Sequence, residues 1–156
     1  MSLHTTTRVP VDDAYAALVG KAVYVFAYYE WVIIYIIECL HPGFVGRYSR
    51  GNPMTSGRVG EELQAVIDDS ATSFAKISQQ ELRSCCSEFE RLIAKRNALI
   101  HAHPLTDTDD SQILGYQTKI SRPIPDMQWP RQELEATVAE FDGVACRALA
   151  LLDKLR

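Results

Sequence analysis

A guanidinium, a carboxamide and an imidazole occur within six residues, Arg96-Asn97-Ala98-Leu99-Ile100-His101, near the end of a segment with helical periodicity. Such groups can bind an anion and transfer protons, because arginine pairs with phosphate oxygens and imidazole titrates near neutral pH. The apolar side chains of residues 79–101 share one helical face, and Arg96 falls near the middle of that face. A buried guanidinium is costly unless paired, so Arg96 requires an anionic partner, an interface or a site.

Two interpretations of this segment stay open. In the first, Arg96 extends its charged end from the apolar face or caps a neighbouring helix, and His101 merely ends its own helix, where a cation is favourable. In the second, Arg96, Asn97 and His101 form an anion site with acid–base capability. Asn97 and His101 can share a face, whereas Arg96 and His101 are about 140° apart around an ideal helix. A second helix, from this chain or from a second copy, would therefore have to supply the facing half.

The segment resembles the Arg-x4-His signature of the HEPN superfamily of small helical proteins, in which a polar residue often follows the arginine. Many members are metal-independent ribonucleases of toxin–antitoxin, abortive-infection or other defence systems. The resemblance implies that Arg96 stabilises the phosphorane charge, that Asn97 orients the histidine or the phosphate, and that His101 moves a proton at the ribose 2′-hydroxyl or the leaving oxygen. It also implies a composite site in a homodimer and a 2′,3′-cyclic phosphate product, with no cofactor and no metal. A common toxin subgroup has tyrosine two places after the histidine, where this chain has His103.

The first hypothesis is thus a metal-independent endoribonuclease of the HEPN type, with RNA as substrate, a second copy as partner and, for a toxin, a cognate antitoxin protein. The alternative is a non-catalytic HEPN-like module that binds a nucleotide or another protein. The net charge of −4 slightly favours the alternative and requires any RNA contact to use a local patch. The alternative interpretation of the connection 41–57 is a solvated loop. Candidates for the patch lie mainly in and beside this connection: Arg47, Tyr48, Arg50, Arg58 and His103.

The length of 156 residues predicts a single domain, 1–156, with a flexible start at residues 1–10. Periodicity predicts an all-α fold, an antiparallel four-helix bundle with a long first helix at about 11–40 and further helices at about 57–76, 79–101 and from Pro130 onward. Ser78 and Glu81 match a capping box, and Pro130 suits the start of a helix. Weak alternation over residues 112–122 is consistent with a short strand or hairpin before the last helix.

The first helix has apolar or aromatic side chains on two faces, the second face being Tyr24, Tyr28, Trp31 and Tyr35. We expect one face to pack in the bundle and the other against a second subunit. A membrane span is disfavoured because Lys21, Glu30 and Glu38 interrupt the apolar run. Glu30 is a buried partner for Arg96, a member of another structural ion pair or a site carboxylate, and the sequence does not choose among these.

The four cysteines are Cys39, Cys85, Cys86 and Cys146, and their spacing does not match a metal site. The first three lie on apolar stretches and are predicted to be reduced core residues of a cytoplasmic protein. Residues 1–10 have no signal-peptide pattern. His101 and His103 lack a neighbouring ligand pattern, and the acidic run after them is predicted to be a solvated loop, so no metal is expected.

Overall fold

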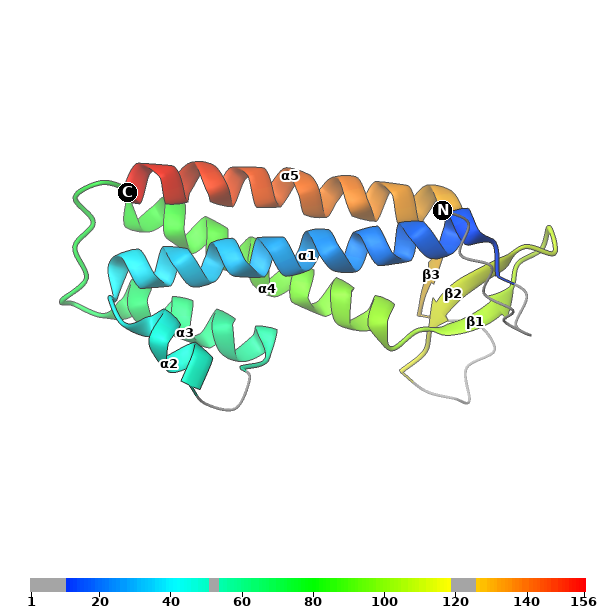
Figure 1. Cartoon of the computed structure of the whole chain (residues 1–156), viewed down its shortest axis with the longest axis horizontal. Helices are drawn as coiled ribbons and strands as arrows, with labels where there is room; N and C mark the ends of the chain where they lie inside the picture. The colour runs from blue at the N-terminus through cyan, green and yellow to red at the C-terminus, as the bar shows by residue number, and fades with distance from the viewer. Residues whose placement is uncertain (1–10, 51–53, 119–125) are drawn as a thin grey trace.

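The computed structural model describes residues 11–50, 54–118 and 126–156, so the predicted flexibility of residues 1–10 lies outside the described residues. Two long helices, α1 and α5, lie side by side, with α4 alongside them, the short helices near one end and a small sheet at the other (Figure 1). The elements in chain order are α1(Asp13–Leu40), α2(Phe44–Arg50), α3(Ser56–Asp68), α4(Gln79–Ile100), β1(His103–Thr106), β2(Gln112–Tyr116), β3(Met127–Trp129) and α5(Arg131–Leu155).

The prediction of a mainly helical fold is confirmed, and three of the predicted helices correspond to α1, α4 and α5. The four-helix bundle is not confirmed, because the described residues form five helices and three strands. The helix expected at about 57–76 ends at Asp68. There the Asp69 carboxylate accepts a hydrogen bond from the Ala71 N–H, and the Thr72 hydroxyl donates to the Val66 carbonyl. Such side-chain bonds to nearby backbone compete with helix continuation.

The connection predicted at 41–57 contains a further helix, α2. Gly43 has a φ of +96°, a backbone conformation that glycine adopts without the steric cost of a Cβ atom. The Glu38 carboxylate accepts hydrogen bonds from the N–H groups of Gly43 and Val45, at 2.9 and 2.8 Å. These bonds lower the pKa of Glu38. One carboxylate from α1 therefore satisfies backbone donors where the chain turns into α2.

The sheet is antiparallel in the order β1-β2-β3, and only β2 falls in the segment where a strand or hairpin was expected. Asp107 and Ser111 close the β1–β2 turn through an N–H to carbonyl hydrogen bond of 2.8 Å. The Tyr15 hydroxyl connects the sheet to α1, because it donates to the Trp129 carbonyl at 2.6 Å and accepts from the Leu114 N–H at 2.9 Å. Trp129 is fully buried, so the sheet is fixed at the end of the helical layer where α4 ends.

The core lies along the inner face of α1. The ring of Phe26 lies 5.3 Å from that of Phe141 on α5 and 6.1 Å from that of Phe89 on α4. Tyr29 packs edge-on against Phe89 at 5.3 Å. By length and composition α1 is also apolar enough to cross a membrane, although Lys21, Glu30 and Glu38 lie within its apolar run. Its buried face contacts α3 and α5, which is the packing of a core helix in a fold compatible with a soluble protein.

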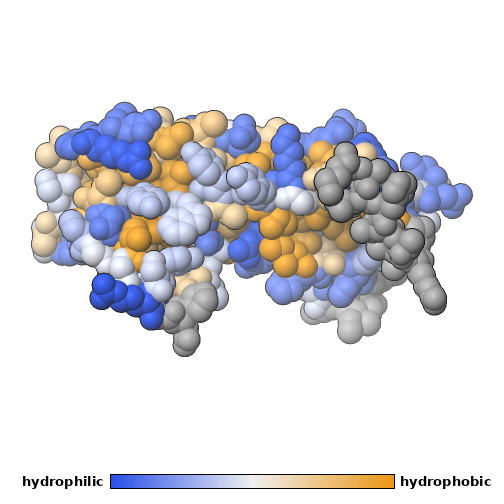
Figure 2. Space-filling model, viewed as in Figure 1, coloured by the Kyte–Doolittle hydropathy of each residue, from blue (hydrophilic) through white to orange (hydrophobic). Residues whose placement is uncertain are grey.

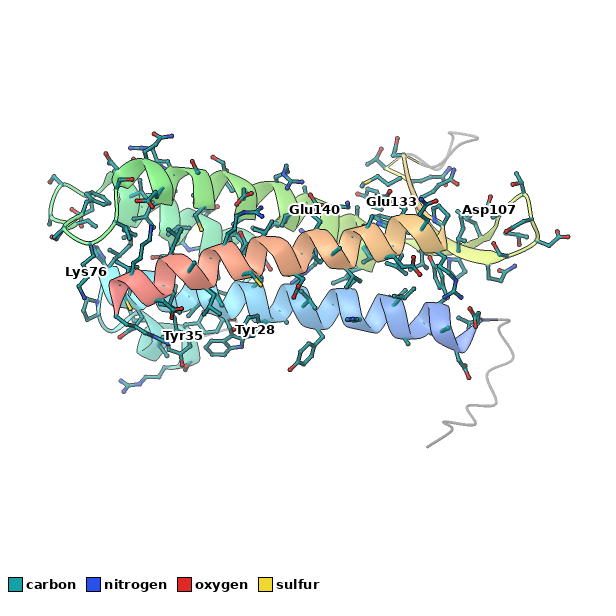
Figure 3. All side chains as sticks on the ribbon, turned by 90° about the horizontal axis from the view of Figure 1, so that it is seen from above. Tyr28, Tyr35, Lys76, Asp107, Glu133 and Glu140 are labelled. Carbon is teal, nitrogen blue, oxygen red and sulfur yellow. The ribbon has the colours of Figure 1, made fainter. Side chains whose placement is uncertain are left out.

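The opposite face of α1 is exposed. Tyr24, Tyr28, Trp31 and Tyr35 are exposed by 75%, 48%, 45% and 41%, and we call these four residues the aromatic stripe. Pale and orange side chains cover much of the surface over α1 in Figure 2, and Figure 3 shows Tyr28 and Tyr35 projecting on the same side of the helix. The sequence-based expectation that only one face of this helix packs within the chain is therefore met.

The capping box at the start of α4 gives a prediction about stability. The Ser78 hydroxyl accepts a hydrogen bond from the Glu81 N–H at 3.1 Å, and the Glu81 carboxylate accepts one from the Ser78 N–H at 2.9 Å. Ser78→Ala should therefore lower the free energy of unfolding in urea by about 1 kcal/mol. Ser87→Ala, at an exposed position inside the same helix, is the matched control and should leave stability unchanged or slightly raised. Equal stability of both variants would contradict a role for the box.

Candidate functional site

Arg96 lies in the last turns of α4, half buried, with its guanidinium directed at α1 and α3. One terminal nitrogen donates to the Asn97 side-chain oxygen at 2.8 Å, and the other donates to the Ser56 hydroxyl at 3.0 Å. The guanidinium carbon lies 5.1 Å from the centre of the Phe26 ring, a cation–π distance. Arg96 occupies the apolar face of α4 because that position places its charge over an aromatic ring and beside two hydrogen-bond acceptors.

The Ser56 hydroxyl also links this guanidinium to an anion. Ser56 is the first residue of α3 and is almost fully buried, and its hydroxyl donates to the Glu30 carboxylate on α1. No ion pair joins Glu30 and Arg96 directly, although both are among the described residues. A chain of hydrogen bonds thus runs from Glu30 on α1 through Ser56 on α3 to Arg96 and Asn97 on α4. Glu30 is only partly buried, and it is connected to Arg96 through the Ser56 hydroxyl and not by a direct ion pair.

His101 is the residue at which α4 ends, and its N–H donates to the Asn97 carbonyl at 3.0 Å. Its imidazole is exposed and makes no hydrogen bond within the described part of the chain. Asn97 and His101 are four residues apart on the helix, so they occupy the same side. Arg96 faces α1 and α3 instead. The structure therefore joins Arg96 to Asn97 and leaves His101 apart from Arg96 in a single chain, as the 140° separation predicts.

Four of the candidate RNA-binding residues lie on α2 and α3, and the fifth, His103, lies apart from them on β1. Arg47 and Arg50 are exposed on the last turn of α2, and the Arg47 guanidinium lies 5.4 Å from the Phe44 ring. Tyr48 packs against the rings of Trp31 and Phe44, at 5.9 and 6.3 Å. Arg58 pairs with two glutamates of its own helix, at 2.9 and 3.1 Å, so its charge is compensated. His103 is exposed at the start of β1, on the far side of the α4 terminus from these residues.

The thiols do not contribute a reactive group at this site. Cys85 and Cys86 are buried in α4, and burial raises their pKa values to about 12 and 11 respectively. The prediction that Cys39 is a core residue is wrong, because it lies on an exposed position of a helix whose two faces have similar composition. Among the described residues, no group of three or more His, Cys, Asp or Glu side chains is arranged to hold a metal ion.

Two residues in contact with Arg96, Ser56 and Phe26, could not be identified from the sequence. Ser56 is separated from Arg96 by 40 positions, and a serine at the start of a helix ordinarily indicates a capping role. Phe26 is one of many apolar residues in the first helix, and its spacing does not link it to Arg96. The misplaced charge of Arg96 was the available signal that partners had to exist.

Comparison of the chain with models of known families, with curated proteins and with solved structures finds no match. The HEPN resemblance therefore depends on the six residues of the segment and on their position at the end of a helix in a mainly helical fold.

The hydroxyl between Glu30 and Arg96 predicts the effect of removing the guanidinium. Arg96→Ala leaves Glu30 hydrogen-bonded to Ser56, so we expect the free energy of unfolding to fall by about 1–2 kcal/mol. Breaking a directly paired buried charge would cost roughly 3–5 kcal/mol. Urea unfolding measures the difference, with Arg91→Ala, an exposed arginine of the same helix, as the control expected to lose less than about 1 kcal/mol. If Arg96→Ala lowered the free energy of unfolding by roughly 3–5 kcal/mol, Arg96 would compensate the Glu30 charge without help from Ser56.

Proposed function

We propose that this protein is a metal-independent endoribonuclease of the HEPN type that cleaves RNA by attack of the ribose 2′-hydroxyl. The observation that supports the proposal best is that the end of α4 carries both an oriented guanidinium and an exposed imidazole that makes no hydrogen bond with the described residues. The first group suits a phosphate and the second suits proton transfer. A toxin or defence role, with an antitoxin as partner and a cytoplasmic location, belongs to the same proposal.

The roles follow from the contacts of each group. Arg96 uses two of its five N–H donors in the contacts with Asn97 and Ser56, so others are free for phosphate oxygens. Asn97 and Ser56 hold the guanidinium plane, which lowers the cost of ordering it when charge develops on the phosphorane. His101 removes the proton of the 2′-hydroxyl or delivers one to the leaving oxygen. A second histidine is needed for both transfers, and a second copy of the chain supplies it.

The dimer contact that completes this site lies at the end of α4. Phe26, over which Arg96 lies, is about 200° around α1 from Tyr28 of the aromatic stripe. A dimer formed through the stripe alone would leave two helices, each about 10 Å thick, between the two Arg96 side chains. Ile100 is an apolar side chain exposed by 46% next to His101, so it offers a contact at the site itself. The aromatic stripe remains a predicted surface for a separate contact between copies.

The alternative, a non-catalytic nucleotide-binding or interaction module, is favoured by one observation. Arg96 already has a hydrogen-bonded route to the Glu30 carboxylate through Ser56, and that arrangement secures three helices without any reaction. A protein of this non-catalytic kind would bind a nucleotide without cleaving RNA.

RNA cleavage in the presence of EDTA tests the proposed function. The purified protein should cleave single-stranded RNA under these conditions, and His101→Ala should lower the rate by about 100-fold or more, because general acid–base catalysis contributes that much. His41→Ala removes an imidazole at the far end of α1 and should retain cleavage. Absence of cleavage by the unmodified protein, or equal cleavage by His101→Ala, would reject the mechanism.

Mixing the unmodified protein with an inactive variant tests whether the site is composite. If one site uses His101 of both subunits, an equal mixture of unmodified and His101→Ala subunits keeps about a quarter of the activity of the unmodified protein at the same total concentration, because random pairing leaves both histidines in a quarter of the dimers. The measurement is the cleavage rate after the two proteins are unfolded and refolded together. Retention of about half of the activity, from subunits that form dimers, would show that each subunit uses its own His101 alone.

A further inference from the structure

A cavity of about 630 Å³ opens on the side of α4 opposite the guanidinium of Arg96. It lies between α4, strands β2 and β3 of the sheet and the first turn of α5. Its volume is within the range of roughly 300–1,000 Å³ typical of pockets that hold small ligands. Asn97 lines this cavity and also accepts the hydrogen bond from Arg96, so one side chain joins the cavity to the candidate site.

The apolar walls of the cavity suit a planar ring. Ala94 and Ala98, one helical turn apart, line it from α4 and leave room because their side chains are short. Tyr116 and Met127 are directly paired across β2 and β3, so their side chains project from the same face of the sheet. An aromatic ring and a polarisable thioether opposite a small-residue helix surface can enclose a heteroaromatic ring.

The polar edge of the cavity carries compensated charges. Lys95 pairs with Glu140 at 2.8 Å and with Glu133 at 3.5 Å, and Arg91 pairs with Glu140 at 2.7 Å. Glu133 and Glu140 lie on the side of α5 that faces α4 (Figure 3). Two cations and two carboxylates leave little net charge to attract a phosphate. The Asn97 oxygen is occupied by Arg96, so its amide N–H groups remain to donate, and the Glu133 carboxylate can accept.

We propose that this cavity binds one nucleobase of a single-stranded RNA, with the base stacked on Tyr116 and its edge hydrogen-bonded to Asn97 and Glu133. Identifying the base as part of an RNA substrate rests on the proposed function, whereas binding of a base does not. His101 follows Asn97 by one turn on the same side of α4. A base held in the cavity therefore brings its own ribose toward the imidazole, and the cavity selects the nucleotide at which the chain is cut.

Binding of the four ribonucleoside 5′-monophosphates to the full chain, measured by titration calorimetry or NMR, tests the cavity without any cleavage. At least one should bind, and Tyr116→Ala should weaken it by about fivefold or more, since stacking on an aromatic side chain contributes at least that much. Tyr116→Phe keeps the ring and should bind normally. Ala94→Leu fills the cavity without removing a contact and should also weaken binding, whereas Ala136→Leu, at an exposed alanine of α5, should not.

Failure of the unmodified protein to bind any of the four nucleotides, or equal binding by Ala94→Leu and Ala136→Leu, would overturn the inference. Cleavage assays with RNA distinguish a failure of this inference from a failure of the proposed function. Cleavage with a base preference that Tyr116→Ala abolishes supports both. Nucleotide binding in the cavity without RNA cleavage supports the cavity and rejects the nuclease. RNA cleavage with nucleotide binding indifferent to Tyr116→Ala and Ala94→Leu supports the nuclease and rejects the cavity.

Discussion

The placement of the Arg96 charge on the apolar face of α4 is the constraint on which the arrangement of this region depends. A guanidinium removed from water needs both an aromatic or apolar surface for its faces and acceptors for its donors. Phe26 supplies the surface, and Ser56 and Asn97 supply acceptors, with the Glu30 carboxylate behind Ser56. Because these partners come from α1, α3 and α4, the same charge that could serve a phosphate also fixes how three helices meet.

The end of α4 consequently has two chemically different sides. Arg96 faces the helical core and brings positive charge, whereas Asn97 faces the cavity against the sheet, where cations and carboxylates compensate each other. The Tyr15 hydroxyl fixes the sheet that forms the second wall, through bonds to two strands. Under the proposed function, Arg96 would bind a phosphate and the cavity would bind a base, and His101 at the end of α4 would be exposed to the RNA backbone.

The sequence alone indicated those parts of the fold whose signals are local. α4 and α5 could be predicted because a capping box and Pro130 mark their starts and their apolar residues repeat at helical spacing. Strands β1 and β3 could not, since they are only four and three residues long. The Tyr15 hydroxyl, which holds β2 and β3, is 99 and 114 positions from its two backbone partners. At the site, the sequence showed that Arg96 occupies a position that suits an apolar residue. Its partner Ser56 could not be predicted, because a serine at the start of a helix is common.

The chemical form of the RNA ends tests the central claim most directly, because attack by the ribose 2′-hydroxyl leaves a product that attack by water does not. Mass spectrometry of a short defined RNA, digested in EDTA and analysed before cyclic ends can hydrolyse, distinguishes them. Our account predicts fragments with a 2′,3′-cyclic phosphate on one side of the cut and a 5′-hydroxyl on the other. Fragments with a 3′-hydroxyl and a 5′-phosphate would contradict it, because the 2′-hydroxyl would then not have been the nucleophile.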